Sequence, residues 1–302
     1  MKDIYQKVLR LKREKNAIIL AHNYQLPEVQ DVADFVGDSL GLAQQATKVD
    51  ASLIILCGVY FMAETAKILN PDKKVLIPDR NAGCPLASFA NERMVKEWRK
   101  RYPDATFVAY VNTTAEVKAN VDICCTSSNA LKIVNSLDSK RVVFLPDKNL
   151  GRYIKERVKD KEIILWPGYC IVHENVNVED VIAVKERFPD ALIIAHPECN
   201  KEVVQIADGV CSTGQMFGFV ENNPQVKNFI VVTEWGINYA LKKRFPDKNF
   251  IEPAERMECK NMKKITIEKV LNSLEKEEYE VKIERNIIEK ARVSIEKMLK
   301  LS

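Results

Sequence analysis

The chain has 302 residues, of which 46% are hydrophobic and 29% charged, and this is ordinary for a globular protein of two or three domains. The net charge of +4 is not gathered with aromatic residues in one basic patch, so we expect no nucleic-acid binding. No apolar run reaches the ~18 residues of a membrane span and the N-terminus lacks a signal-peptide core, so we expect a cytoplasmic protein with no membrane partner.

Apolar stretches predict short strands that alternate with helices along the chain. In the first third we expect a helix at 3–15, a strand at 18–20, helical spacing over 29–49 that breaks near Gly37 and Gly41, a strand at 53–56, a helix at 62–69 and a strand at 75–77. The middle third predicts strands at 106–111, 121–125, 142–145 and 162–165, and helices at 114–119, 128–137 and 149–158. The last third predicts strands at 191–195, 229–233 and 249–251, helices at 178–187, 200–206 and 236–244, and two closing helices at 266–276 and 286–300.

Strands this short and this apolar are typical of parallel sheets that helices cover on both faces. The expected fold class is therefore α/β, built from small α/β/α sandwich domains. In such sheets the functional residues follow the carboxyl ends of the strands.

One construction occurs three times: an apolar strand, a proline, a short loop and a cysteine. It lies at Val75–Cys84, Ile163–Cys170 and Asn249–Cys259, and the cysteines are 86 and 89 residues apart. A long period that is seen three times indicates one supersecondary unit used in triplicate.

Other landmarks keep this period. Two sets fall in register: His22, Tyr110 and His196 at strand ends, and Asp34, Asp122 and Asp208, each five residues before a serine or threonine. We therefore predict three domains, at 1–86, 87–172 and 173–262, with the helices of 263–302 packed on the first. A pseudo-threefold axis would turn the strand ends of all three towards one central cavity.

The three repeated cysteines are candidate metal ligands. In a reducing compartment eight cysteines are not read as disulfides. A small buried hydrophobe is the simpler interpretation of any one cysteine, and it suits those in or beside apolar strands: Cys57, Cys124, Cys125 and Cys211. It suits Cys84, Cys170 and Cys259 less well, because they share one loop position.

Three converging thiolates can hold a zinc ion or three irons of a [4Fe-4S] cluster. With three protein ligands, a cluster keeps one iron open as a Lewis acid that assists loss of water. Zinc with three cysteines and a water is the alternative.

Imidazole, phenol and carboxylate groups stand together at two strand ends. His22-Asn23-Tyr24 follows the first strand and His196-Pro197-Glu198-Cys199 follows its counterpart, and such groups are the usual material for proton transfer. We expect desolvation to raise the pKa of Glu198 towards neutrality. The alternative for Glu198 is an exposed salt bridge with Lys201.

Ser39, Ser127 and Ser212-Thr213 stand where helices are expected to begin. Plain N-capping would explain each of them. The functional interpretation is anion binding at helix N-termini, which suits a substrate rich in carboxylates or phosphate, and Asn112 adds a polar group.

Six motifs together resemble the quinolinate synthase family, the A protein of NAD biosynthesis. They are Ile19-Leu20-Ala21-His22-Asn23-Tyr24-Gln25, Phe35-Val36-Gly37-Asp38-Ser39, Tyr110-Val111-Asn112, Thr126-Ser127, Ala195-His196-Pro197-Glu198-Cys199 and Ser212-Thr213-Gly214-Gln215-Met216. The resemblance covers essentially the whole chain. It implies three α/β/α domains in a triangle around an oxygen-sensitive [4Fe-4S] cluster.

The resemblance also implies a reaction: condensation of iminoaspartate with dihydroxyacetone phosphate to quinolinate, phosphate and water. A transient contact with the enzyme that supplies iminoaspartate would follow. By motif match, Cys84, Cys170 and Cys259 would hold the cluster, and the dicarboxylate would be held by His22, Ser39, Tyr110, Asn112, Ser127, His196, Glu198, Ser212 and Thr213. Acid/base steps would fall to Glu198, Tyr24, His196 and His173. Family members often have Cys-Pro-x-His where this chain has Cys170-Ile171-Val172-His173, so a different local loop is expected.

Two other functions remain open from the residues alone. An aconitase-like hydro-lyase would share the open iron and the carboxylate-binding groups but would need no triose phosphate. An iron–sulfur sensor or carrier would need few polar cavity residues, which disfavours it here.

Overall fold

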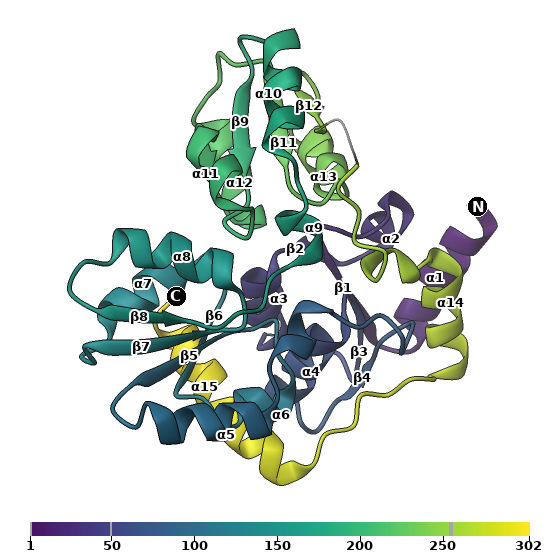
Figure 1. Cartoon of the computed structure of the whole chain (residues 1–302). Helices are drawn as coiled ribbons and strands as arrows, with labels where there is room; N and C mark the ends of the chain where they lie inside the picture. Colours follow the sequence, from purple (N-terminus) through teal and green to yellow (C-terminus); the bar gives the residue numbers. More distant parts are fainter. Residues whose placement is uncertain (1, 49, 254–255) are drawn as a thin grey trace.

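The computed structural model describes residues 2–48, 50–253 and 256–302 (Figure 1). Within them the chain forms three parallel four-stranded sheets with helices packed around each sheet. The predicted α/β fold class is confirmed. No described helix has both the length and the apolar character needed to cross a membrane.

The first unit carries the N-terminal sheet. Its elements are α1 (Lys2–Glu14), β1 (Ala17–His22), α2 (Pro27–Val32), β2 (Phe35–Gly37), α3 (Ser39–Ala46), β3 (Leu53–Cys57), α4 (Tyr60–Leu69) and β4 (Lys74–Leu76). The stretch 29–49, expected to be helical with breaks, contains a strand between two short helices. Its Asp34 accepts the backbone N–H of Ile19, which draws the chain into the sheet beside β1.

The second and third units repeat this order. The second comprises η1 (Leu86–Phe89), α5 (Glu92–Arg101), β5 (Thr106–Tyr110), α6 (Ala115–Lys118), β6 (Ile123–Cys125), α7 (Ala130–Ser136), β7 (Arg141–Leu145), α8 (Lys148–Arg157) and β8 (Glu162–Leu165). The third comprises α9 (Ile171–Glu174), α10 (Val178–Arg187), β9 (Leu192–Ala195), α11 (Lys201–Ile206), β10 (Gly209–Val210), α12 (Thr213–Glu221), β11 (Asn228–Val232), α13 (Ile237–Arg244) and β12 (Asn249–Ile251). Helices α5 and α9 and strand β10 are absent from the predicted elements, and of α12 only the start near Ser212-Thr213 is expected. The apolar stripe of α5 is thin, with Val95 its one buried residue, and β10 has only two residues.

All three sheets have the same strand order, β2-β1-β3-β4, β6-β5-β7-β8 and β10-β9-β11-β12. In each unit an aspartate also accepts a hydrogen bond from the backbone N–H of a residue in or next to the first strand of the unit. The bonds join Asp34 to Ile19 (2.8 Å), Asp122 to Phe107 (2.7 Å) and Asp208 to Ile193 (2.8 Å), always across 15 residues. The repeat therefore extends to individual hydrogen bonds.

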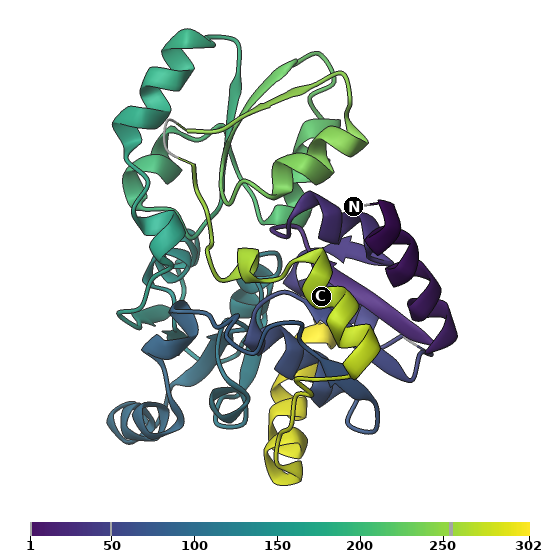
Figure 2. The ribbon, with the colours of Figure 1, turned by 90° about the vertical axis from the view of Figure 1, so that its right-hand side faces the viewer.

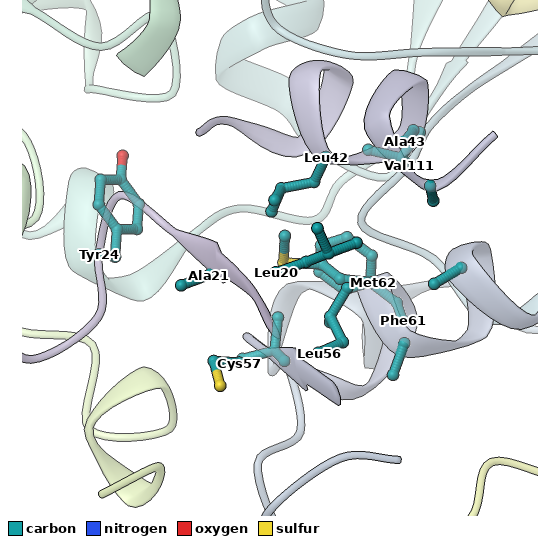
Figure 3. Close-up of a cluster of buried hydrophobic side chains, with 14 of the residues drawn as sticks. Leu20, Ala21, Tyr24, Leu42, Ala43, Leu56, Cys57, Phe61, Met62 and Val111 are labelled. Atoms are coloured by element: carbon teal, nitrogen blue, oxygen red, sulfur yellow. The ribbon is translucent and has the colours of Figure 1, made fainter. Parts of the chain in front are cut away.

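The hydrophobic core joins the first two units more closely than the third. One large cluster of buried side chains runs through both, and Figure 3 shows the part around Leu20, Leu56 and Met62. The large cluster also reaches the third unit, through residues such as Phe229 and Val231. One side of the second sheet and one side of the third pack on separate clusters, which include Val143 and Val181 respectively. Figures 1 and 2 both show this unit standing above the other two.

The closing segments η2 (Met262–Lys264), α14 (Ile267–Lys276) and α15 (Arg285–Lys300) divide between two units. Helix α14 lies beside α1 on the first unit, where residues 263–302 are expected. Helix α15 instead packs mainly on α6 and β6 of the second unit, and also on α4 of the first. Its buried Ser294 donates a hydrogen bond to the carbonyl of Lys118, at 2.8 Å.

Candidate active site

A cavity of about 70 Å³ lies where the three units meet. The cavity has room for several waters or a small ligand. All but one of the site residues expected from the sequence line it: His22, Tyr24, Ser39, Cys84, Tyr110, Asn112, Ser127, Cys170, His173, His196, Glu198, Thr213 and Cys259. Ser212 is fully buried beside Thr213 and is not among the lining residues.

Because the strand order is the same in all three sheets, these residues fall into three groups, two at opposite edges of the sheets and one between them. The outer strands β2, β6 and β10 are followed by Ser39, Ser127 and Thr213, which we call the hydroxyl edge. The opposite outer strands β4, β8 and β12 are followed by Cys84, Cys170 and Cys259, the thiol edge. Strands β1, β5 and β9 lie between and end at His22, Tyr110 and His196. Because all strands in each sheet are parallel, their carboxyl ends reach one side together.

Two of the three cysteines are anchored by buried carboxyl groups, one of which, Asp147, has a pKa raised well above its ordinary value by burial and by the nearby Glu198. The backbone N–H of Cys170 donates to Asp147 at 3.1 Å, and that of Cys259 donates to Glu234 at 3.2 Å. Glu234 also forms a 2.8 Å ion pair with Lys263. No described carboxylate accepts the N–H of Cys84, so the thiol edge is not symmetric.

The thiol edge fits a metal centre. Its cysteines are free, and they line both the central cavity and a second hollow of about 840 Å³. Burial raises the pKa of all three thiols, that of Cys84 to about 12, so they need a cationic group to become thiolates. The remaining cysteines line neither space, and Cys57, Cys124, Cys125 and Cys199 are buried.

A chain of hydrogen bonds crosses the cavity wall from the first unit to the third. The Tyr24 hydroxyl lies 2.5 Å from the Thr233 hydroxyl, Thr233 lies 2.8 Å from Nε2 of His173, and Nδ1 of His173 lies 2.9 Å from the Glu198 carboxylate. In Figure 3 the Tyr24 hydroxyl points away from the apolar cluster. Since Nδ1 donates to the carboxylate, Nε2 accepts from Thr233, which in turn accepts from Tyr24.

Thr233 is absent from the expected site residues. In sequence it only ends a strand in register with Cys57 and Leu145. The one sequence feature that could have identified Thr233 is its polarity, because the residues at the same position in the other two repeats, Cys57 and Leu145, are apolar.

Glu198 is ionised at neutral pH, contrary to expectation. Burial, the largest single influence, raises its pKa, but the hydrogen bond from His173, the nearby His196 and the Tyr110 hydroxyl together outweigh burial and the pKa falls to about 2. The side chain is 3% exposed and has no ion pair with Lys201 among the described contacts, so the exposed salt bridge is wrong. One carboxylate oxygen, Oε1, has no hydrogen-bond partner in the structure.

Two histidines are neutral donors. Burial lowers the pKa of His22 to about 4 and that of His196 to about 3. In both, Nδ1 accepts the backbone N–H of the residue two positions on: Tyr24 at 3.2 Å and Glu198 at 3.3 Å. The proton therefore sits on Nε2, which is available to a ligand.

At the hydroxyl edge N-capping accounts for Ser212 alone. The residues in the cap positions of α3, α7 and α12 are Asp38, Asn129 and Ser212. Ser39 and Thr213 are instead the first residues of their helices. Plain capping thus leaves the hydroxyls of Ser39, Ser127 and Thr213 unexplained.

The helix ends at the hydroxyl edge are tied to one another. The Ser128 hydroxyl donates to the Asp38 carboxylate at 2.6 Å and lies 2.7 Å from the Ser212 hydroxyl, so one residue of each unit takes part. A Cβ on Gly214 would come within 2.6 Å of Asp38, so this junction requires glycine there.

Comparisons with known proteins agree with this site. A family model described as "Quinolinate synthetase A protein" matches residues 6–300. The quinolinate synthase of Caldicellulosiruptor saccharolyticus is 50% identical over 299 residues, which cover 99% of this chain and 98% of the relative. Those of Thermodesulfovibrio yellowstonii and Aquifex aeolicus are 50% and 49% identical, covering 98% and 100% of this chain and 97% and 95% of their own.

Proposed function

The chain belongs to the quinolinate synthase family, and from that premise we propose that it condenses iminoaspartate with dihydroxyacetone phosphate to quinolinate, phosphate and water. It is an enzyme of NAD biosynthesis, and we place it in the cytoplasm. The observation that carries the proposal is the convergence of three thiols, one from each unit, with the Tyr24–Thr233–His173–Glu198 chain on one cavity.

Cys84, Cys170 and Cys259 would hold three irons of a [4Fe-4S] cluster. When bound, the cluster supplies an open iron that acts as a Lewis acid on a substrate hydroxyl or carboxylate. The fit rests on three free thiols that share one edge of the cavity and on the absence of a described disulfide among them.

Glu198 acts as the base, because its carboxylate is ionised and its Oε1 accepts no hydrogen bond within the usual distance from a described residue. Glu198 can take up a proton from the substrate and Tyr24 can give one to it. The hydrogen bonds point from Tyr24 through Thr233 and His173 towards Glu198, so a proton passes from Glu198 to Tyr24 only when every donor in the chain reverses. Condensing an imine with a carbonyl compound and then losing water needs several such transfers, and one continuous chain serves them all.

The polar side chains at the hydroxyl edge and between the two edges would hold the anionic substrates. Helices α3 and α12 direct their N-termini, with Ser39 and Thr213, to the cavity, and helix N-termini favour carboxylates and phosphate. His22 and His196 donate from Nε2, and Tyr110, Asn112 and Ser127 add hydrogen-bonding groups. Ser212 contributes by fixing the first turn of α12, where Thr213 lies.

The test is quinolinate formation by anaerobically purified, cluster-replete protein. Quinolinate should appear only when iminoaspartate and dihydroxyacetone phosphate are both present, and the protein should be brown. Dehydration of a hydroxy-dicarboxylate without the triose phosphate would favour the aconitase-like enzyme. A brown protein with neither activity would favour a sensor or carrier.

Iminoaspartate carries an imine that water hydrolyses, so direct delivery would conserve it. We therefore include in the proposal a transient contact with the enzyme that supplies iminoaspartate. Faster quinolinate formation when that enzyme is added, at a fixed concentration of free iminoaspartate, would support this contact.

A further inference from the structure

Cys170, His173 and Glu198 bring three different ligand types to one point. Nδ1 of His173 lies 3.2 Å from Sγ of Cys170 and 2.9 Å from Oε2 of Glu198. All three ligand atoms lie within 4.8 Å of one another, and His173 and Glu198 are 2% and 3% exposed. A thiol, an imidazole and a carboxylate are the three groups that bind Zn²⁺ in proteins.

The spacing of these atoms suits one tetrahedral ion. Zinc binds sulfur at about 2.3 Å and nitrogen or oxygen at about 2.0–2.2 Å, so its ligand atoms lie roughly 3.3–3.6 Å apart. The two distances from Nδ1 are a few tenths of an ångström shorter than this. Small side-chain shifts would therefore admit the ion and leave a fourth position open to the cavity.

The surroundings of His173 suit a metal ligand as well. Its other nitrogen, Nε2, is already bonded to the Thr233 hydroxyl at 2.8 Å, and such a bond orients a metal-binding imidazole. With a metal on Nδ1, the proton moves to Nε2 and donates to Thr233. The hydroxyls of Thr233 and Tyr24 can both reverse their direction, so the bonds from His173 to Thr233 and from Thr233 to Tyr24 are kept, and the metal replaces the bond between His173 and Glu198.

Charge and access favour the same conclusion. A thiolate and a carboxylate buried side by side would repel, and a divalent cation balances both. Oε1 of Glu198 is buried, and no described residue donates a hydrogen bond to it. Cys170 also lines the 840 Å³ hollow, which offers a route for a hydrated ion from outside.

We propose that protein lacking the cluster binds one divalent transition metal, Zn²⁺ fitting best, through Cys170, His173 and Glu198. This ligand set shares only Cys170 with the thiol edge. Zinc bound here and a cluster held by Cys84, Cys170 and Cys259 exclude each other. The metal also takes Nδ1 of His173 and the Glu198 carboxylate, which the proposed proton transfers need.

The test uses the full-length protein freed of iron by chelation under anaerobic conditions and titrated with Co²⁺ as a visible stand-in for Zn²⁺. One equivalent should give a thiolate-to-cobalt absorption band and the visible bands of four-coordinate cobalt. Zn²⁺ should displace the cobalt and abolish both.

Variants separate this site from one made of three thiols. Binding of Co²⁺ should weaken by at least about tenfold in each variant that loses a ligand: Cys170→Ser, His173→Gln and Glu198→Gln. Thr233→Val keeps all three ligands but removes the bond that orients His173, and should weaken binding by about 10- to 100-fold. Cys84→Ser and Cys259→Ser should bind as the parent does. Cys199→Ser is the matched control, because its buried thiol lies next to Glu198 in sequence and faces the carbonyl of Val232 instead.

Two results would overturn the proposal. Equal loss of affinity in Cys84→Ser and Cys259→Ser would assign the metal to the thiol edge. Unchanged affinity in both His173→Gln and Thr233→Val would remove His173 from the site. Circular dichroism of each variant guards against misfolding, and Thr233→Val remains informative if His173→Gln does not fold.

A second experiment rests on the proposed cluster. Apoprotein preloaded with one equivalent of Zn²⁺ and then given Fe²⁺ and sulfide should stay colourless until EDTA is added, whereas His173→Gln should turn brown without EDTA. A brown colour that develops equally fast in zinc-loaded parent would contradict mutual exclusion. Failure of zinc-free parent to form a cluster would count against the proposed function alone and leave the Co²⁺ result unaffected.

Discussion

The thiol edge and the hydroxyl edge of the cavity come from the same three units and the same strand order, yet their chemistry differs. At the thiol edge, Cys170 and Cys259 are each held by a buried carboxyl group. At the hydroxyl edge the helix ends are joined through Ser128, which bridges Asp38 and Ser212. Triplication thus supplies positions, and the residues at each position divide the work between a metal-binding edge and an anion-binding edge.

The largest effect is expected at the thiol edge. Cys84→Ser, Cys170→Ser and Cys259→Ser should each lose the cluster and all quinolinate formation, because each removes one of the three proposed ligands. Iron content and the absorption spectrum of anaerobic protein measure this. Cys57→Ser and Cys211→Ser should keep iron, since neither thiol lines the cavity. Iron retained in Cys170→Ser would break the assignment of this edge.

Between the two edges, Glu198→Gln should separate catalysis from binding of the cluster. A positioned base contributes a factor of about 100–10,000, so turnover should fall by that factor while the iron and the dicarboxylate affinity remain. Quinolinate formation by cluster-replete protein is the measurement, with the exposed Glu202→Gln as control. Turnover within about threefold of the parent would end the assignment of Glu198 as base.

The carboxylate anchors can be tested through Glu234→Gln. The change leaves the largely buried Lys263 without its charged partner, the fully buried Glu234, and breaking a buried pair costs about 3–5 kcal/mol. Urea unfolding of the apoprotein measures the loss, and iron retention should fall with it. The exposed pair of Glu221 and Arg244 supplies the control, since Glu221→Gln should cost under ~1 kcal/mol. Equal costs would mean that the thiol edge is not specially anchored.

At the hydroxyl edge we expect an effect on affinity and none on iron. Replacing both Ser39 and Ser127 by alanine should weaken competitive inhibition by a dicarboxylate such as malate at least tenfold to a hundredfold, because each lost hydrogen bond to a charged group costs about 1.5–3 kcal/mol. Ser52→Ala, at an exposed position, is the control. Unchanged inhibition would remove both serines from the site.

The last expected effect concerns the protonation of His22, between the two edges. Its pKa is about 4 in the folded protein and about 6.5 unfolded, so the unfolded chain binds the proton first as pH falls. His22 therefore lowers the free energy of unfolding as pH decreases from 6.5 towards 4, by at most about 1.4 kcal/mol per pH unit.

The check is the difference between the parent apoprotein and His22→Gln, which should have a flatter profile over that range. The two profiles must be subtracted because Glu64, whose pKa is raised to about 7 by burial, changes the free energy of unfolding in the opposite direction between pH 4.5 and 7. Parallel profiles would show that His22 is not buried as a neutral imidazole.

Much of the architecture could be predicted because it depends on local patterns. Short apolar stretches, each followed by a proline or a polar residue, predict the strands of the sheets, and the repeated spacing of motifs predicts the three units. The same register placed His22, Tyr110 and His196 at strand ends, and it selected Cys84, Cys170 and Cys259 from eight cysteines. Elements with little apolar signal, such as α5 and β10, could not be found this way.

The sequence by itself therefore determined the fold class, the triplication and most of the residues that line the cavity. Only the tertiary structure decided how those residues act on one another. The ionised state of Glu198, the part of Thr233 and the approach of Cys170 to His173 and Glu198 all depend on which strand ends of different units face each other. Such contacts join residues far apart in the chain, and a local pattern carries no information about their distance, whereas hydrogen bonding and pKa depend on that distance directly.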